Sequence, residues 1–519
     1  MKVTLISPYL DIQPFGLRTL SAHLKREGHN VQLIFLPRYF TDRYEDETLD
    51  DVVEISRGTD LIGISLTTNF FDNVIQITQR LKKDLNIQIL WGGIHPTIRP
   101  EECLNYADMV CVGEGEEALV ELARKMENAK DYHDVRGVWF KKNGKIIKNK
   151  NRPLIQDLDS ILFPDFRYDT QYILSDGHVQ LMNESLLEKH MRTMVHVGTM
   201  YTTVATRGCP FGCTYCCNNT LNRMYSGQKI VRKRSTENLI KEMMKAKSIL
   251  PFIKSFGLAD DLFFIRTIEE IKEFCEKYKE NVRLPLHIGG ANPSNLTMEK
   301  LATLVDAGLK NFRLGIQTGS ERTKILFRRY YSNKQVEEVV KAIHTFKDKI
   351  RRPLYDIILD NPWETEEDLK DTLMFLSKFP TPYALNLYSL TFYPETELYW
   401  KAKKDGIITD DLEEVYRKVY HDCRNTYLNR LFFLLKRYTV SGWRIPTKIM
   451  WALTNRTLRK LKVSQLIYII LKIQYMLYEC LNDMRKGDRS RILRYITKGR
   501  FTQHISHDAD MAAHAAGKR

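Results

Sequence analysis

The sequence predicts an α/β protein in which a doubly wound parallel sheet is followed by a second run of β/α units and a helical C-terminal extension. Short apolar runs alternate with amphipathic runs over residues 2–127 and again over 201–391. Such alternation is typical of strands and helices in a parallel sheet covered on both faces. The length of 519 residues allows two or three domains. A hydrophobic content of 43% and a charged content of 28% are ordinary for a soluble globular protein.

The first module, residues 1–134, is predicted to be a Rossmann- or flavodoxin-like domain. Ligands of such sheets bind beyond the carboxyl ends of the strands. The loops at those ends are rich in Gly and small polar residues, which suits a phosphate- or nucleotide-bearing ligand. The predicted strands are residues 2–7, 31–35, 61–66, 88–91 and 109–112, and the predicted helices are 17–27, 50–57, 70–84, 100–106 and 116–126.

Residues 135–195 are predicted to connect this module to the next one. The part from 135 to 150 is expected to form a β-hairpin that turns at Asn143 and Gly144, because Asn-Gly is the strongest short hairpin signal. The remainder is mixed in composition and carries no specific motif, so we assign it no structure of its own.

Three cysteines follow the first strand of the second run. Cys209, Cys213 and Cys216 have the spacing C-x3-C-x2-C within the stretch YTTVATRGCPFGCTYCCNN, residues 201–219. Cysteine is the usual ligand of iron–sulfur clusters, and three thiolates leave one iron of a four-iron cluster open, as in metal sites that keep a position for substrate. A structural zinc site is the alternative. Zinc normally needs a fourth Cys or His at comparable spacing, and Cys217 is too close to Cys216 to chelate beside it.

With its flanking residues R-G-C-P-F-x-C-x-Y-C, this stretch resembles the radical SAM enzymes, whose signature follows the first barrel strand. The resemblance implies a 4Fe-4S cluster on Cys209, Cys213 and Cys216. Its open iron would chelate S-adenosylmethionine (SAM), which is then cleaved to a 5′-deoxyadenosyl radical with an electron from a flavodoxin- or ferredoxin-type donor. It also implies a partial (β/α)6 barrel over residues 196–406. The strands expected are 201–206, 253–258, 285–289, 311–316, 354–359 and 384–391, with helices 235–248, 268–278, 298–307, 334–347 and 366–378 between them.

Each of these strand ends carries polar residues, and functional residues of such barrels lie there. Gln317 lies in G-I-Q-T-G-S, which resembles the family's G-x-E-x-G-S, and its amide can accept a hydrogen bond from a ribose hydroxyl. D-N-P-W-E-T from Asp360 resembles G-x-P-x-E-T, and Y-P-E-T from Tyr393 resembles Y-P-G-T. Asp260 and Asp261 are alternatively a general acid–base pair, of which one faces the cavity because adjacent side chains point opposite ways. The residues that the resemblance assigns to SAM are Tyr215, Gly257, Asp260, Asn292, Gln317, Thr318 and Asp360.

The N-terminal module resembles the cobalamin-binding domain that precedes the barrel in one class of radical SAM enzymes (class B methyltransferases). The matching segments are G-G-I-H-P-T, residues 92–97, and G-E-G-E, residues 113–116. Gln13 stands where the family's D-x-H-x-x-G motif has its histidine, so we expect no histidine ligand to cobalt from this loop. A flavodoxin-like domain with an empty crevice is the alternative, and His95 is either a ligand contact or a turn residue. The residues assigned to cobalamin are Pro14, Gly16, Ser65, Thr67, Gly92, Gly93, His95, Gly113, Glu114, Gly115 and Glu116.

The net charge of +15 is concentrated in the C-terminal segment, since residues 424–500 hold 18 Lys/Arg and 3 Asp/Glu. A basic helical domain is expected over 407–500, with helices 427–438, 447–461 and 464–484, followed by a tail over 501–519. No stretch reaches the roughly 20 uninterrupted apolar residues of a membrane span. Basic amphipathic helices can lie on an anionic bilayer or bind an anionic ligand. A helical cap with a solvated basic face is the alternative.

The resemblance implies a cobalamin-dependent radical SAM enzyme that methylates an unactivated carbon of a small molecule, lipid or peptide. The alternatives are a non-methylating radical rearrangement or cyclisation, an RNA-modifying radical SAM enzyme and a non-catalytic cobalamin or redox sensor. We do not expect a nucleic-acid partner, because RNA-modifying relatives usually end in a small β-barrel and this chain ends in helices. Nine cysteines without a secretory signal indicate the cytoplasm, with peripheral contact to an anionic membrane open to the basic helices.

Overall fold

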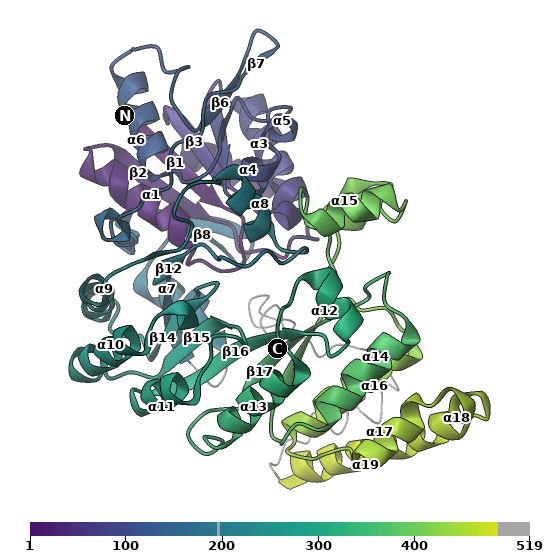
Figure 1. Cartoon of the computed structure of the whole chain (residues 1–519). Coiled ribbons are helices and arrows are strands. Elements are labelled where there is room, and N and C mark those ends of the chain that lie inside the picture. Colours follow the sequence, from purple (N-terminus) through teal and green to yellow (C-terminus); the bar gives the residue numbers. More distant parts are fainter. Residues whose placement is uncertain (195–197, 486–519) are drawn as a thin grey trace. The chain divides into compact units, whose positions relative to one another are not determined.

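The computed structural model describes residues 1–194 and 198–485 (Figure 1). These residues form two compact units: the first comprises 1–289 and 391–418, and the second comprises 290–390 and 419–485. The predicted tail over 501–519 and the last part of the predicted basic domain lie outside the described residues. The predicted domain boundaries themselves stay predictions.

The first unit contains the predicted doubly wound sheet. Its central strands run parallel in the order β5-β4-β3-β1-β2, so the chain reverses its direction of winding between β1 and β3. Ligands of doubly wound sheets bind at that reversal. The strands are nearly continuous apolar runs and are buried, as expected for a sheet covered on both faces. The elements are β1 (Lys2–Ser7), α1 (Phe15–Arg26), β2 (Asn30–Phe35), α2 (Asp46–Ser56), β3 (Leu61–Ser65), η1 (Thr68–Phe70), α3 (Phe71–Asp84), β4 (Gln88–Gly92), α4 (Ile94–Ile98), α5 (Pro100–Cys103), β5 (Met109–Cys111) and α6 (Glu116–Glu127).

A β-hairpin extends each edge of this sheet. The predicted one, β6 (Val138–Lys142) and β7 (Lys145–Ile147), pairs with β5 and is confirmed, with both turn residues at positive φ. A second hairpin, β8 (Gln171–Ser175) and β9 (His178–Leu181), pairs with β2 in the segment that we expected to be an unstructured connector. Its turn is Asp176-Gly177, also at positive φ, and Asp-Gly is a hairpin signal of the same kind. The remaining elements here are η2 (Leu158–Ser160), η3 (Tyr168–Thr170) and α7 (Glu184–Met191).

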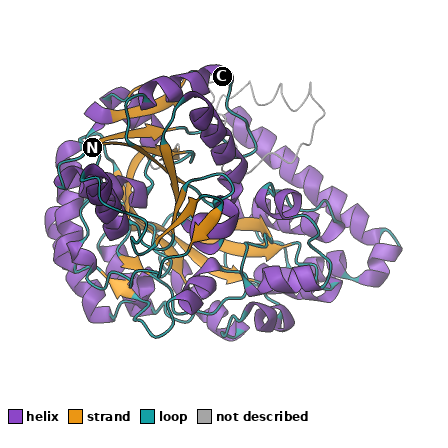
Figure 2. Cartoon of the chain, turned by 90° about the horizontal axis from the view of Figure 1, so that it is seen from above, coloured by secondary structure: helices purple, strands orange, loops and turns teal. Residues whose placement is uncertain are grey.

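All six predicted strands of the partial barrel are present. In the first unit β11, β14 and β15 pair in parallel, and in the second unit β16, β17 and β18 do the same. Figure 2 shows helices bordering the strands throughout. In the first unit the elements are β10 (Arg192–Met194), β11 (Gly198–Thr203), β12 (Thr206–Arg207), α8 (Cys217–Met224), β13 (Arg232–Lys233), α9 (Thr236–Ile249), β14 (Ser255–Leu258), η4 (Phe263–Ile265), α10 (Ile268–Asn281), β15 (Leu286–Ala291, which crosses into the second unit), α15 (Glu397–Lys404) and η5 (Leu412–Tyr416).

The second unit has one helix that the sequence did not predict. α12 begins after a Ser320 cap and is only seven residues long. A helix of this length is too short to show helical periodicity in the sequence. The elements are α11 (Met298–Asp306), β16 (Leu309–Gln317), α12 (Glu321–Phe327), α13 (Asn333–His344), β17 (Leu354–Leu359), α14 (Glu366–Ser377) and β18 (Ala384–Ser389).

Four helices complete the second unit. The predicted helix over 447–461 is two helices, because the Asn455 backbone is extended and its side chain accepts from Leu458 N to cap the second one. α16 and α17 pack against α14, and α16 to α18 all contact α19. No helix in the described ranges combines the length and apolar character that a membrane crossing needs. The helices are α16 (Tyr427–Val440), α17 (Thr447–Thr454), α18 (Arg456–Lys460) and α19 (Val463–Arg485).

Candidate active site

The three cysteines lie on the loop between β12 and α8. Cys209, Cys213 and Cys216 form no disulfides, and burial, with smaller contributions from Cys216, Asp261 and Cys213, raises the pKa of Cys209 to about 12. Cys213 is buried, and the other two are half-buried. Within the described ranges, no three His, Cys, Asp or Glu side chains are close enough together to hold a single metal ion. The ligands of a four-iron cluster stand farther apart than those of one ion.

The backbone holds this loop tightly. Gly208 has a φ of +87°, and a Cβ there would lie 2.2 Å from the Ile230 carbonyl oxygen, so only glycine fits. The Cys209 carbonyl accepts from Asn222 Nδ2 at 2.8 Å, and Cys216 N donates to the Cys213 carbonyl. These contacts fix the backbone of the cysteine loop.

Two glutamates of G-E-G-E bind two arginines that flank the cysteine loop. Arg207 donates to Glu114 (3.1 Å) and to Glu116 (2.5 Å), and Arg232 donates to both oxygens of Glu114 (2.7 and 2.9 Å). The arginines are directly opposite one another in the β12–β13 ladder. Burial alone would raise the pKa of Glu116, but Arg207 holds it below its usual value. We call Glu114, Glu116, Arg207 and Arg232 the glutamate–arginine joint.

Sequence reasoning assigned both glutamates to cobalamin but missed the arginines. In the structure, the two glutamate carboxylates accept from Arg207 and Arg232, and Ile155 N also donates to Glu114. The available signal was the R-G-C sequence, in which Arg207 stands two residues before the first cluster cysteine. The joint therefore ties the end of β5 to the cysteine loop within one unit.

The other predicted cobalamin residues gather at the reversal point of the sheet. Gly16, Thr67 and Gly93 are exposed there, while Glu116 is buried. The Ser65 hydroxyl lies 3.0 Å from the Tyr9 hydroxyl. The half-exposed residues of the set are Pro14, Ser65, Gly92, Gly113, Glu114 and Gly115.

Two of the glycines are required by close packing. Gly93 has a φ of +106°, and a Cβ there would lie 2.6 Å from the Leu66 carbonyl oxygen. Gly113 has a φ of +94°, and its Cβ would meet the Tyr225 hydroxyl at 2.0 Å. Tyr225, at the end of α8, was not predicted as a site residue. It brings a phenol hydroxyl from the cysteine-loop side to the G-E-G-E turn.

Gln13 has a structural task. Its Nε2 donates to the Met200 carbonyl and its Oε1 accepts from Thr202 N, both at 2.9 Å, so the side chain pairs with β11 as another strand would. The residue is 5% exposed. The amide places its donor and its acceptor side by side, as the backbone of a neighbouring strand does, which gives a physical reason for glutamine at this position.

His95 is fully buried. Its Nδ1 lies 3.1 Å from the Thr68 hydroxyl, and its ring packs against Phe71 and Tyr416. Burial, with the charge of Arg99, lowers its pKa to about 3, so the ring is neutral at physiological pH. Protein contacts surround the ring, and its assignment to cobalamin stays a prediction.

A later segment of the chain, residues 391–418, covers the G-G-I-H-P-T loop. Asn69 Nδ2 donates to the carbonyls of Tyr416 and Lys418, both at 3.1 Å, and the Tyr416 hydroxyl donates to Glu102 at 2.7 Å. This segment packs with the first unit up to residue 418.

Among the predicted SAM residues of the first unit, Asp260 is the most constrained. It is 3% exposed, and its Oδ2 accepts from Ala205 N at 3.1 Å. Burial raises its pKa to about 6 despite that bond and the nearby Arg266. Asp261 instead accepts from Asn218 Nδ2 in α8 at 3.0 Å, so the two carboxylates point to different partners, as expected. Tyr215 is half-buried on the cysteine loop, and a Cβ on Gly257 would lie 3.0 Å from the Met200 sulfur.

The predicted SAM residues of the second unit take part in turns and caps. Gln317 and Asp360 have positive φ values of 69° and 60°, which residues other than glycine seldom adopt. Asp360 accepts from Arg424 N and Asn429 Nδ2. Asn292 Oδ1 accepts from Ser294, and Thr318 lies 3.1 Å from the Thr372 hydroxyl. Their contact with SAM stays a prediction.

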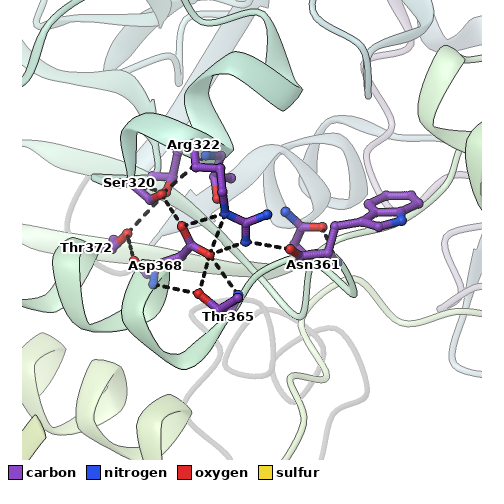
Figure 3. A network of polar contacts seen from close by, with 9 residues as sticks. Ser320, Arg322, Asn361, Thr365, Asp368 and Thr372 are labelled. Carbon is purple, nitrogen blue, oxygen red and sulfur yellow. Dashed lines mark hydrogen bonds and ion pairs between the residues drawn. The ribbon is translucent and has the colours of Figure 1, made fainter.

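Asp368, which sequence reasoning missed, binds the two strand-end motifs of this unit together (Figure 3). It accepts from Ser320 Oγ at 2.6 Å and from the backbone N and hydroxyl of Thr365 at 2.8 and 2.7 Å, and it pairs with Arg322. The signal was T-x-x-D, a capping box at the start of α14.

Glu364 lies beside this network without a cation of its own. Its Oε2 is sealed from solvent and has no hydrogen-bond partner. Burial raises its pKa to about 7, although hydroxyl contacts lower it in part. Glu364 thus contrasts with the buried and paired Glu116.

Two family models match this chain. The B12 binding domain matches residues 1–123, and the Radical SAM superfamily matches residues 203–376. The chain is a radical SAM protein with a B12-binding domain. The predicted fold class is therefore confirmed: a B12-binding domain, a curled parallel half-barrel and a helical C-terminal region.

Relatives of this radical SAM protein carry out more than one kind of reaction. It is 27% identical over 405 residues to an uncharacterized methyltransferase of Pyrococcus horikoshii, covering 76% of this chain and 79% of that protein. It is 26% identical over 325 residues to the anaerobic magnesium-protoporphyrin IX monomethyl ester cyclase of Synechocystis, covering 61% and 59%. The solved structure of the cobalamin-dependent SAM radical enzyme OxsB, with aqua-cobalamin and SAM bound, has a TM-score of 0.62 at 15% identity, covering 99% of this chain and 78% of that one.

The residues present fit the cofactors of the two domains. Three cysteines without disulfides, on a loop whose backbone is fixed at Gly208, match a cluster with three cysteine ligands, and the cluster's iron would stabilise the thiolate forms. The sheet reversal offers exposed Gly16, Thr67 and Gly93 to a large ligand. Gln13 is already occupied, so cobalamin would bind without a side-chain ligand from that loop.

Proposed function

We propose that this protein methylates an unactivated carbon atom of its substrate, using two molecules of SAM and two electrons from an external donor for each product. When bound, the cluster supplies reductive cleavage of SAM, and cobalamin supplies the transferable methyl group. One SAM ends as S-adenosylhomocysteine, and the other as methionine and 5′-deoxyadenosine, which has gained the substrate's hydrogen atom.

The protein's own residues hold and orient these groups. Cys209, Cys213 and Cys216 would hold the cluster. Asp260 fixes the chain just after β11 through Ala205 N, and Gln13 fixes β11 itself. Both contacts set the direction in which the cysteine loop leaves the sheet.

The observation that best supports methyl transfer is the glutamate–arginine joint. It connects the loop assigned to cobalamin with the loop assigned to the cluster through buried ion pairs in one unit. A reaction in which a substrate radical must meet a methyl donor needs the two cofactors at a fixed separation, because misplacement by about 1 Å can reduce the rate by about a hundredfold. The glutamate–arginine joint would keep the two cofactor-binding loops at such a fixed separation.

A radical cyclisation is the second candidate, supported by the similarity to the Synechocystis cyclase. It would use the same cluster residues but would leave no SAM-derived methyl group in the product. The two candidates therefore differ in one measurable respect.

The test uses full-length protein reconstituted with iron and sulfide under anaerobic conditions, loaded with cobalamin and given methyl-deuterated SAM, a reductant and fractionated cell extract. We expect S-adenosylhomocysteine and 5′-deoxyadenosine to form together with a product that carries a deuterated methyl group. Formation of 5′-deoxyadenosine with an unlabelled product would contradict methylation and favour cyclisation. The Cys217→Ala variant serves as a matched control that should stay active, whereas Cys216→Ala should not.

A further inference from the structure

A stripe of apolar side chains lies exposed along α19. We call it the α19 stripe: Leu466, Ile469, Ile470, Ile473 and Leu477, which are 49–60% exposed. Their spacing of three and four residues puts them on one face of the helix.

The opposite face of α19 provides its packing. Ser464, Leu471 and Tyr475 are 0–8% exposed. The Tyr438 hydroxyl of α16 donates to the Leu471 carbonyl at 2.9 Å, and the Ser464 hydroxyl donates to the Ala452 carbonyl of α17. The helix is therefore anchored by one apolar face and presents a second one outward.

The surroundings of the α19 stripe are cationic. Residues 424–478 contain eleven Lys and Arg and no Asp or Glu. Lys462 lies one helical turn before Leu466, and the side chains of Lys448, Lys460 and Lys462 are exposed and form no ion pair with a described residue. The pKa of Lys472 is lowered by burial and by the like charges of Arg437 and Arg430. Positive charge thus exceeds negative charge here, with Arg459 of α18 paired to Glu366.

We propose that α17 to α19 form a membrane-docking surface that lies on an anionic lipid bilayer, with the α19 stripe in the boundary between headgroups and acyl chains. An apolar stripe flanked by lysine and arginine is the pattern of helices that lie in this interface. Exposed Trp451, which is 48% exposed, adds a side chain that prefers the headgroup level. Because none of the described helices can span a bilayer, this surface lies on the membrane.

Charge complementarity selects this partner over others. An anionic bilayer offers both negative charge and an apolar interior, so it satisfies the lysines and the α19 stripe together. A nucleic acid would satisfy only the lysines, and a second copy of this strongly basic surface would bring like charges together. The proposal concerns where the protein resides and does not depend on the proposed methylation.

The experiment is cosedimentation of the full-length, cofactor-loaded protein with vesicles of phosphatidylcholine, with or without phosphatidylglycerol. We expect binding to the anionic vesicles, weakened by salt, and little binding to neutral ones. Ile470→Gln combined with Ile473→Gln should weaken binding at least about tenfold, because each buried apolar side chain contributes. Lys460→Glu combined with Lys462→Glu, which leaves the α19 stripe intact, should weaken it about as much.

Ile325→Gln is the matched control, since Ile325 is 74% exposed on α12 of the same unit and should change nothing. Circular dichroism should show every variant to be folded, because the substituted side chains are exposed. Absence of binding to anionic vesicles would overturn the proposal. A wild-type protein that forms a dimer through this surface, with the dimer lost in the Ile470/Ile473 double variant, would also overturn it. So would complete displacement of the protein from vesicles by RNA, if the double variant keeps the wild-type affinity for vesicles.

Discussion

The glutamate–arginine joint and the C-terminal helices treat charge in opposite ways. In the joint, every charged group meets an opposite charge, and Glu116 and Arg232 are about 95% buried. In α17 to α19, Lys448, Lys460 and Lys462 are exposed and form no ion pair with a described residue, whereas Arg459 pairs with Glu366. Buried charges that are paired resist any change of one partner, whereas exposed ones cost little to alter. The paired charges of the joint fix internal geometry, and the exposed lysines support the proposal that the helices bind an external partner.

The largest effect is expected from Arg207→Ala. It leaves Glu116 buried without its cation, which should lower the free energy of unfolding by about 3–5 kcal/mol. Urea unfolding followed by circular dichroism measures this. The control is Arg57→Ala, which breaks an exposed pair with Glu54 and should cost less than about 1 kcal/mol. Equal losses in both variants would break the comparison.

Glu364 tests the comparison with a largely sealed carboxylate whose nearby cation, Arg322, pairs with Asp368 instead. Its pKa is about 7 when folded and 4.5 when unfolded, so the folded state binds the proton more tightly. Stability from this group is full below pH 4.5 and is lost as pH rises through 7, by about 3 kcal/mol.

The Glu364→Gln variant should therefore gain about 3 kcal/mol over the wild type between pH 4.5 and 8. Hydrogen exchange of the backbone amides in the neighbouring α14 would measure this gain in stability. If the free energy of unfolding depends on pH in the same way in both proteins, the pKa of Glu364 is not raised, which would contradict this prediction.

A smaller effect is expected from Gln13→Ala, which removes two hydrogen bonds to β11 and leaves the Met200 carbonyl and Thr202 N–H unpaired. The loss should be about 1–3 kcal/mol, measured by thermal unfolding. Gln13→His should not rescue it. A Gln13→His variant as stable as the wild type would contradict the structural task assigned to this side chain.

The smallest effect is expected from Ile470→Gln. Its side chain is 55% exposed, so the free energy of unfolding should change by no more than about 0.5 kcal/mol. Leu471→Ala, one residue along on the buried face, should cost about 2–5 kcal/mol. The difference between the two variants in the free energy of unfolding measures how exposed the α19 stripe is.

The strand segments and most helices could be predicted because apolar periodicity and turn residues are local properties of the chain. The hairpin at Asn143-Gly144 shows this. The partners of Gln13, Glu114 and Glu116 could not be predicted, because Met200, Arg207 and Arg232 lie far away in sequence and only the fold brings them together. α12 was missed because seven residues are too few to show a period.

The central claim is that Cys209, Cys213 and Cys216 hold a four-iron cluster whose open iron binds SAM. Electron paramagnetic resonance of the reconstituted, reduced protein tests it most directly. The account predicts a cube-type spectrum that changes when SAM is added and disappears when all three cysteines are replaced by alanine. A wild-type protein without that spectrum, or a triple variant that keeps it, would contradict the account.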